Sequence, residues 1–145
     1  MEAVAATKAV TLTTEIPSNP LLCLGDETRL HQLCLILLDN AIKYNHSQGT
    51  VQIRLRRTTR HRIQLVVEDS GLGIPARDLP HIFDRFYRSA SSKRQASGSG
   101  LGLAIATWIV REHHGHLDAQ SHVGEGSRII VELPIHGLES DTSAP

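Results

Sequence analysis

The sequence predicts an α+β fold, a two-layer sandwich in which helices pack on one face of a mixed, mostly antiparallel sheet. Residues 51–56 and 63–67 are two strand-like segments separated by a short polar turn, which is typical of a hairpin. Residues 116–121 and 127–133 form a second such pair, joined through Gly-Glu-Gly. Residues 27–44 and 101–114 carry apolar side chains at helical spacing. Each helix therefore has one apolar stripe, which is expected to pack on the sheet.

Local patterns predict the remaining elements. Residues 10–16 alternate in polarity and indicate a strand, and the short apolar run at 21–24 indicates another. With the two hairpins, this makes about six strands. Residues 76–85 are expected to be helical with an interruption near Pro80, which gives three main helices in total.

The two long helices have predicted ends and predicted buried faces. Asp26 is expected to cap the first helix, and Gly115 is expected to end the second. The side chains expected to face inward are Leu30, Leu33, Cys34, Leu37, Leu38 and Ala41 in the first helix, and Leu101, Ile105, Trp108 and Ile109 in the second.

Composition narrows the class of protein. The chain has 145 residues, which suits one domain, and its formal net charge is zero, so bulk electrostatic binding to nucleic acid or membrane is not indicated. There is no apolar run near the length of a membrane span and no signal-peptide pattern, so a soluble, cytoplasmic chain is expected, whether or not its parent is membrane-anchored. Cys23 and Cys34 are expected to be buried, reduced thiols. His113, His114 and His116 are expected at the surface, without zinc-type spacing.

A first glycine motif follows the strand-like segment 63–67, where residues 69–74 read Asp-Ser-Gly-Leu-Gly-Ile. An ionised Asp69 only accepts hydrogen bonds, which suits the exocyclic amine of adenine, a donor. Gly71 and Gly73 would let the backbone approach a base where a Cβ would clash. By itself the motif also fits an ordinary turn at the end of a strand.

A second glycine motif, Gly-Ser-Gly-Leu-Gly-Leu at residues 98–103, opens the second long helix. A helix N-terminus offers free N–H groups and a positive dipole end, and glycines let phosphate come close. The motif lacks the Lys-Ser/Thr of a Walker A loop, and by itself it also fits a flexible hinge. Residues 87–98, just before it, are small, polar and basic, which indicates a mobile loop.

The end of the first long helix carries a third candidate group, Asn40, Lys43 and Tyr44. An amide oxygen such as that of Asn40 can ligate a magnesium ion that also holds phosphate oxygens. Lys43 could pair with phosphate, and Tyr44 could pack near the base or ribose. The alternatives are a polar helix end for Asn40 and a solvated charge for Lys43.

An aromatic and basic cluster, Phe-Asp-Arg-Phe-Tyr-Arg at residues 83–88, precedes the predicted loop. Its expected role is structural, with Phe83 and Phe86 anchoring the base of the loop. A secondary possibility is that Arg85 or Arg88 reaches phosphate.

Taken together, these residues resemble the catalytic ATP-binding domain of sensor histidine kinases, within the GHKL ATPase superfamily. Residues 37–44 are similar to its N box, 69–74 to its first glycine box, 83–87 to its F box and 98–104 to its second glycine box. The resemblance covers residues 10–134 and implies the Bergerat α/β sandwich. It implies a domain at residues 9–136 with an ATP lid at about 88–97, flanked by flexible tails at 1–8 and 137–145.

The resemblance also implies cofactors and site residues. ATP and Mg²⁺ are the expected cofactors, with Asn40 on the metal, Asn40 and Lys43 serving catalysis, and Asp69 selecting adenine. The ATP-binding residues implied are Asn40, Lys43, Tyr44, Asp69, Gly71, Gly73, Ile74, Arg88, Gly98, Ser99, Gly100, Leu101, Gly102 and Leu103.

The partners implied are domains of a longer kinase. The family's phosphate acceptor is a histidine on a separate dimerisation domain, and no histidine of this chain has that context. The chain would then transfer the γ-phosphoryl group of ATP to that histidine, and the parent would signal to a response regulator. The isolated domain is expected to be a monomer.

Ile36 departs from the family pattern, which usually has a second polar residue one helical turn before Asn40. Because isoleucine cannot ligate a metal or orient a water, a degenerate nucleotide-binding or scaffold domain with weak or no kinase activity is a second hypothesis. A gyrase-like or MutL-like ATPase fragment is a third. The absence of that class's general-base glutamate at position 36 argues against it.

Overall fold

The computed structural model describes residues 9–21, 23–59, 61–85, 87 and 101–135. The elements in chain order are strand β1 (Thr11–Glu15), helix α2 (Glu27–Lys43), strands β2 (Thr50–Thr59) and β3 (Arg62–Asp69), the 3₁₀ turn η1 (Leu79–His81), helix α4 (Gly102–Glu112), and strands β4 (His116–His122) and β5 (Gly126–Pro134).

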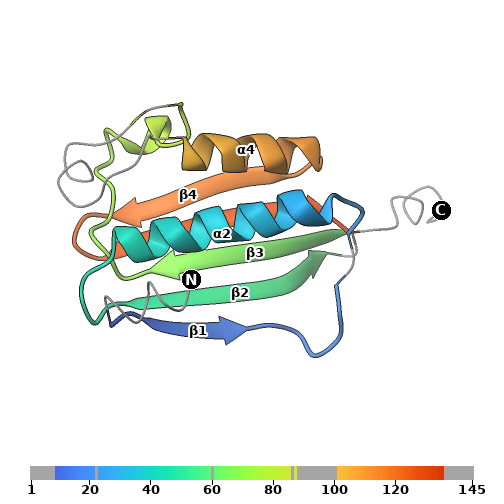
Figure 1. The fold of residues 1–145 in the computed structure, drawn as a ribbon, viewed down its shortest axis with the longest axis horizontal. Helices are drawn as coiled ribbons and strands as arrows, with labels where there is room; N and C mark the ends of the chain where they lie inside the picture. Colours follow the sequence, from blue (N-terminus) through green and yellow to red (C-terminus); the bar gives the residue numbers. More distant parts are fainter. Residues whose placement is uncertain (1–8, 22, 60, 86, 88–100, 136–145) are drawn as a thin grey trace.

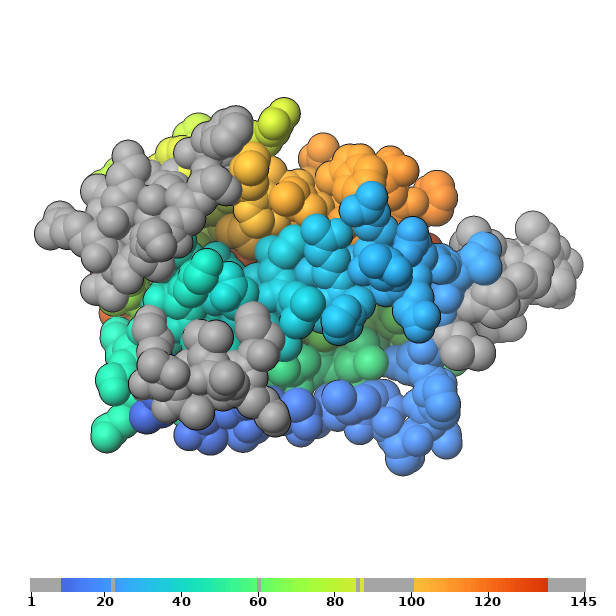
Figure 2. All heavy atoms as spheres, in the orientation of Figure 1, coloured from blue at the N-terminus to red at the C-terminus, as the bar shows by residue number. Residues whose placement is uncertain are grey.

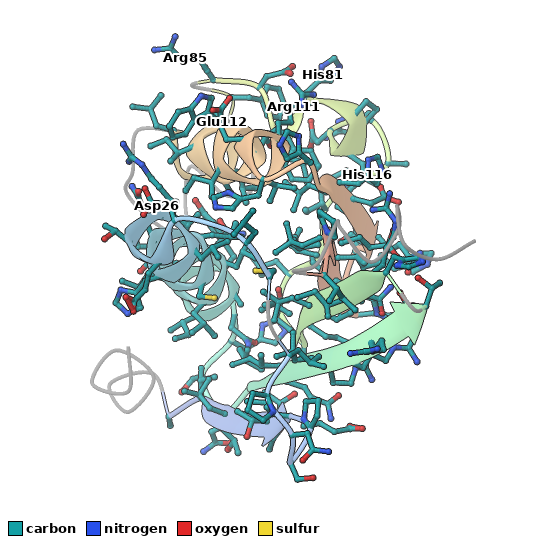
Figure 3. The ribbon with its side chains drawn as sticks, turned by 90° about the vertical axis from the view of Figure 1, so that its right-hand side faces the viewer. Asp26, His81, Arg85, Arg111, Glu112 and His116 are labelled. Atoms are coloured by element: carbon teal, nitrogen blue, oxygen red, sulfur yellow. The ribbon has the colours of Figure 1, made fainter. Side chains whose placement is uncertain are left out.

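Five strands form one sheet in the order β1-β2-β3-β5-β4. β1 runs parallel to β2, and the β2–β3, β3–β5 and β4–β5 pairs are antiparallel. Figure 1 shows α2 and α4 lying across one face of this sheet, and Figure 3 shows the helical and sheet layers from the side. The predicted two-layer sandwich with a mixed, mostly antiparallel sheet is confirmed.

α2 starts and ends where its sequence favours it. The Asp26 carboxylate accepts a hydrogen bond from the Arg29 N–H at 3.1 Å, and Glu27 and Lys43 carry charges that suit the helix dipole. Its buried side chains are Leu33, Leu37, Ala41 and Ile42. Cys34 is exposed, contrary to expectation, because the buried stripe runs along positions 33, 37 and 41, and Cys34 falls outside it. Cys23 is partly buried.

α4 packs against α2, and Figure 2 shows the two helices side by side on the face it displays. Its buried residues are Ala106, Ile109 and Val110. Trp108, predicted to face inward, is 48% exposed, and the Arg29 guanidinium lies 5.0 Å from the centre of its ring. Of the four side chains predicted to face inward, only Ile109 is buried, while Leu101 and Ile105 are partly buried. The buried stripe of α4 is therefore rotated from the predicted one, because α2 packs against that side of the helix. The helix ends at Glu112 with His113 as its C-cap, and His114, not Gly115, adopts the left-handed conformation after it.

Two other predictions were wrong. Residues 21, 23 and 24 form no strand, because this stretch connects β1 to α2 and none of these residues pairs in the sheet. Residue 22 lies outside the described residues. The predicted helix at 76–85 shrinks to the single turn η1, since Pro80 lacks the N–H that a longer helix would use. The described part of the chain therefore has five strands and two α-helices besides η1.

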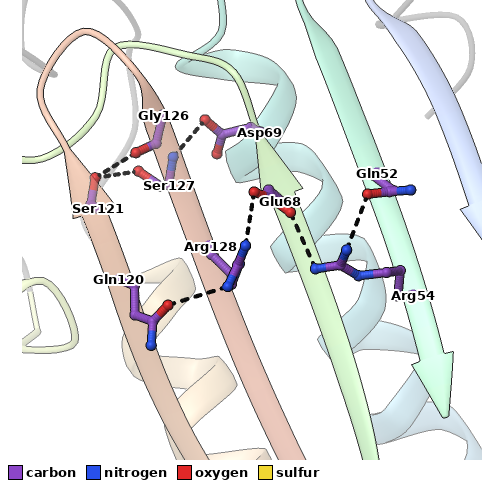
Figure 4. A network of polar contacts seen from close by, with 9 residues as sticks. All are labelled: Gln52, Arg54, Glu68, Asp69, Gln120, Ser121, Gly126, Ser127 and Arg128. Atoms are coloured by element: carbon purple, nitrogen blue, oxygen red, sulfur yellow. Dashed lines mark hydrogen bonds and ion pairs between the residues drawn. The ribbon is translucent and has the colours of Figure 1, made fainter.

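The core lies between the sheet and the two helices. Its fully buried side chains with the largest volumes are Leu33, Leu37, Ile42, Val51, Ile109, Val110 and Val131. The opposite face of the sheet carries a polar row that crosses four strands, drawn in Figure 4: Gln52 on β2, Glu68 on β3, Arg128 on β5 and Gln120 on β4. Alternation along each strand therefore puts apolar side chains under the helices and charges on the other face.

His113 joins the start of α2 to the end of α4. Its Nδ1 lies 2.8 Å from the Ile109 carbonyl oxygen, and its Nε2 accepts the Asp26 N–H at 3.0 Å. Because a carbonyl only accepts and an N–H only donates, these partners assign the neutral ring with the proton on Nδ1. Figure 1 shows the start of α2 and the end of α4 at the same end of the molecule. The surface position expected for His113 was wrong, since only 9% of the residue is exposed.

Replacing His113 with alanine is expected to destabilise the domain. The change empties a buried site and removes the acceptor of the Asp26 N–H, a combined loss of about 2–4 kcal/mol. Urea unfolding of both proteins measures it. The matched control is His116→Ala, because His116 is an exposed histidine at the start of β4. This substitution should change the free energy of unfolding by less than about 0.5 kcal/mol. Equal stability of the two variants would contradict the role given to His113.

Candidate functional site

Segments far apart in the sequence meet at one end of the molecule. The Leu72 N–H donates to the carbonyl oxygen of Tyr44, just past the end of α2, at 3.1 Å. The Leu72 carbonyl accepts the N–H of Gly124, in the β4–β5 turn, at 2.8 Å. At the start of α4, a Cβ added to Gly102 would lie 3.5 Å from the Ile36 Cγ2 of α2. The fold therefore brings together the end of α2, the first glycine motif and the described part of the second.

Asp69, the last residue of β3, has a carboxylate fixed by backbone donors. Its Oδ1 accepts the Gly71 N–H at 2.8 Å and the Ser127 N–H at 3.3 Å, the latter drawn in Figure 4. Burial raises the pKa of Asp69 to about 6, against the lowering effect of these two hydrogen bonds. The result is a partly buried, oriented carboxylate with an unusually high proton affinity, a combination frequent at functional sites.

The raised pKa makes the stability of the ligand-free domain depend on pH. The folded state binds the Asp69 proton more tightly than the unfolded state, whose ordinary value is 3.8, so this stabilisation is complete below pH 3.8 and lost as pH rises through about 6. Between pH 5 and pH 7 the loss is on the order of 1 kcal/mol. Urea unfolding of wild type and Asp69→Asn at both pH values isolates the contribution. A stability difference between the two proteins that stays constant with pH would contradict it.

Gly71 and Gly73 are required by close packing within the protein. A Cβ on Gly71 would lie 2.4 Å from the Tyr44 carbonyl oxygen. Gly73 has a φ of +77°, and a Cβ there would lie 2.1 Å from the carbonyl oxygen of His122. The sequence argument assigned these glycines to the approach of a base; in the structure each also lets the loop after β3 press against its neighbours. The Ile74 N–H donates to the Ser121 Oγ at 2.7 Å.

Sequence reasoning missed a polar group that supports this loop. Asn45, just after α2, is buried, and its side chain donates to the Thr50 carbonyl at 3.0 Å and accepts the His46 N–H at 2.8 Å. The Ser70 hydroxyl accepts the Thr50 N–H at 2.8 Å. The Asn-His-Ser sequence after the helix is a turn signal, but it does not reveal the partner on β2.

Asn40 and Lys43 lie in the last turns of α2, and Tyr44 caps it. The backbone N–H of Tyr44 donates to the carbonyl of Asn40 at 3.3 Å. The Lys43 ammonium lies 2.9 Å from an Asp39 carboxylate oxygen, and these side chains are 41% and 38% exposed. Because an exposed pair of this kind contributes only about 0–1 kcal/mol, Lys43 can exchange its partner for an anion at small cost.

Phe83, expected to anchor the base of the predicted loop, packs against the core. The Tyr87 hydroxyl donates to the carboxylate of Asp78, a buried residue that the sequence did not single out, and this bond raises the pKa of Tyr87. Phe86, Arg88, the predicted lid at 88–97, and Gly98, Ser99 and Gly100 lie outside the described residues. Leu101 precedes the first turn of α4, which contains Gly102 and Leu103.

A hollow of about 450 Å³ lies at the start of α2 and the end of α4, lined by Leu24, Arg29, Trp108, His113 and their neighbours. None of the described residues that line it belongs to the predicted nucleotide site. Among the described residues, no three His, Cys, Asp or Glu side chains are grouped so as to hold a metal ion. The described helices include none long and apolar enough to cross a membrane.

Known proteins resemble this chain in sequence. The sequence model of the family of histidine kinase-, DNA gyrase B- and HSP90-like ATPases matches residues 25–137 of this chain. The sensor histidine kinase RppB of Synechocystis is 37% identical over 89% of this chain and 28% of its own length. The sensor histidine kinase YkoH of Bacillus subtilis is 41% identical over 82% of this chain and 26% of its own length. The chain thus spans about a quarter of these two relatives.

Solved structures share the fold. The mycobacterial sensor histidine kinase MprB superposes with a TM-score of 0.83 at 34% identity, over 93% of this chain and 90% of that one. Full-length ShkA in complex with AMPPNP superposes with a TM-score of 0.82 at 26% identity, over 94% of this chain and 28% of that one. The family match, these relatives and the shared sandwich lead to one assignment: the chain belongs to the histidine kinase-, DNA gyrase B- and HSP90-like ATPase family, as the ATP-binding catalytic domain of a sensor histidine kinase.

Proposed function

We propose that this domain binds ATP with Mg²⁺ and transfers the γ-phosphoryl group to a histidine on a separate dimerisation domain of its parent kinase, within two-component signalling. The observation that carries the proposal is the Asp69 carboxylate, held through Oδ1 by two backbone N–H groups next to the glycine loop. Its remaining acceptor capacity suits the amine of adenine. The relatives with this domain are named sensor histidine kinases, which favours a kinase over a degenerate scaffold.

Each predicted site residue has a proposed role. Asp69 accepts the adenine amine, and the loop containing Gly71, Gly73 and Ile74 lies against one side of the base. Tyr44 packs near the base or ribose. The residues proposed to bind the phosphates are Lys43, Arg88, Gly98, Ser99, Gly100, Leu101, Gly102 and Leu103, with the backbone N–H groups at the start of α4 as donors.

Asn40 is the proposed magnesium ligand. Its amide oxygen is a hard donor of the kind that Mg²⁺ prefers. When bound, Mg²⁺ would neutralise phosphate charge. The protein's own part is to position ATP so that the acceptor imidazole nitrogen can bond to the γ-phosphorus while the bond to the β–γ bridging oxygen breaks and ADP leaves.

Ile36 is compatible with this proposal. It packs against the core and lies near Gly102, where it contributes an apolar contact between α2 and the start of α4. The proposed domain covers residues 9–136 and acts as a monomer when isolated. Its partners are the dimerisation domain and, through the parent, a response regulator.

Calorimetric titration of the 145-residue chain with a non-hydrolysable ATP analogue, with and without Mg²⁺, tests nucleotide binding. Magnesium-dependent binding is the expected result, and no binding by the folded domain would refute the site. Transfer is tested in the intact parent kinase by incorporation of labelled phosphate from ATP. Binding without incorporation would leave a nucleotide-binding domain and refute the kinase activity.

A further inference from the structure

The side chain of Ser121, near the end of β4, contacts three separate backbone or side-chain groups. Its Oγ accepts the Ile74 N–H at 2.7 Å and donates to the Gly126 carbonyl at 2.9 Å. It also lies 2.8 Å from the Ser127 Oγ. Figure 4 draws the contacts to Gly126 and Ser127 beside Asp69. One hydroxyl therefore connects the loop after β3 to both sides of the β4–β5 turn.

The hydrogen-bonding capacity of this hydroxyl is fully used. A serine hydroxyl has one hydrogen to donate and two acceptor positions. With the hydrogen on the Gly126 carbonyl, which can only accept, the two acceptor positions receive the Ile74 N–H and the Ser127 hydroxyl. Ser121 is thus held in one orientation by partners from two segments.

Both of these partners lead to the Asp69 carboxylate. The Ser127 N–H donates to the Asp69 Oδ1 at 3.3 Å. Ile74 belongs to the loop after β3, in which the Gly71 N–H donates to the Asp69 Oδ1. In the same loop, Gly73 packs so closely against the His122 carbonyl that there is no room for a Cβ. The loop and the turn that together orient the carboxylate are therefore fixed to each other through Ser121.

We propose that Ser121 is a positioning residue that sets the preference of the site for the 6-amino group of adenine, by holding Ile74 and Ser127 and through them Asp69. This inference rests on the proposed function, in which Asp69 accepts a hydrogen bond from that amine. Ser121 acts on the Asp69 carboxylate only through Ile74 and Ser127. Its removal should therefore weaken recognition of the amine more than recognition of the triphosphate.

The test compares two ligands on the 145-residue chain: a non-hydrolysable ATP analogue and the matching purine riboside triphosphate, which lacks the 6-amino group. Wild type should prefer the ATP analogue. Ser121→Ala leaves the Ile74 N–H without its acceptor and is expected to lose about tenfold in affinity for the ATP analogue, with a much smaller loss for the purine analogue. Ser121→Thr, which keeps the hydroxyl, should restore the preference.

Thr59→Ala is the matched control, because its hydroxyl accepts the His61 N–H at the far end of the β2–β3 hairpin. It should leave both affinities unchanged. Equal losses for the two ligands in Ser121→Ala, or an unchanged preference, would overturn the inference while leaving the proposed function in place. A wild type without preference for the ATP analogue would overturn the inference together with the proposed contact of Asp69 with the adenine amine. If thermal unfolding shows that Ser121→Ala is unfolded, Ser121→Cys replaces it, because cysteine is close to serine in shape but its sulfur is a weak acceptor. A preference for the ATP analogue equal to that of wild type in Ser121→Cys would then overturn the inference.

Discussion

Asp69→Asn is expected to reduce the affinity for ATP at least about 100-fold while leaving the domain folded. The asparagine oxygen can still accept the Gly71 and Ser127 N–H groups that now bond to Oδ1. The other position then becomes an amide NH₂, which donates, and faces the adenine amine, which also donates. The site therefore loses a charge-assisted acceptor and gains two opposed donors. Calorimetry with a non-hydrolysable ATP analogue at pH 7 measures the change.

The same substitution should not destabilise the ligand-free domain at pH 7. At pH 7 Asp69 is ionised, and burial makes this charged form unfavourable, which is why its pKa is raised. A neutral amide at this position does not carry that desolvation cost. Loss of affinity with equal or higher stability would separate a functional carboxylate from a structural one. The matched control is Glu68→Gln on the opposite face of the sheet, where Glu68 pairs with Arg54 and Arg128 at 3.2 Å. It removes the same charge one residue away and should leave the affinity unchanged; tight ATP binding by Asp69→Asn would exclude the proposed adenine contact.

The parts of the fold that the sequence predicted are those decided by neighbours along the chain. The two hairpins need only alternation and a turn, and α2 needs only a periodic stripe and the Asp26 cap, so both were found. The Asp69 motif was found for the same reason, because it directly follows a strand. Residues 21, 23 and 24 belong to an apolar run with the composition of a strand, but none of these three pairs in the sheet, and composition alone does not reveal that.

Three further misses, at His113, Ser121 and Trp108, concern contacts between residues distant in sequence. His113 was placed at the surface because it lies at the end of a predicted helix, but it is buried against the start of α2, where Asp26 is 87 residues away in sequence. Ser121 was read only as part of a strand, although its partner Ile74 is 47 residues away. Trp108 was assigned inward on size and spacing, while Arg29 of the other helix covers its ring at the surface. The periodicity of a sequence therefore predicts which face of a helix or strand is apolar. Which polar side chains become buried depends on the packing of elements that are distant in sequence.

Asn40→Ala is expected to remove the magnesium dependence of ATP binding and to lower phosphoryl transfer in the intact parent kinase by at least about 100-fold. Asn40 is half-buried near the end of α2, between Ile36, which approaches the start of α4, and Tyr44, whose carbonyl holds the glycine loop. Asn40 therefore lies on α2 between two residues that contact the segments proposed to bind the phosphates and the base. The measurements are calorimetry with and without Mg²⁺, and the initial rate of labelled phosphate incorporation.

Two further variants separate a ligand role from a structural one. Asn40→Asp keeps an oxygen ligand and should keep magnesium-dependent binding. Gln32→Ala changes another half-buried polar residue two turns earlier on α2, bonded to Arg29 at 3.2 Å, and should affect neither readout. If Asn40→Ala binds the analogue with unchanged magnesium dependence, the ion is held elsewhere. A loss shared by Asn40→Ala and Gln32→Ala would instead indicate damage to the helix, because only Asn40 is a proposed magnesium ligand.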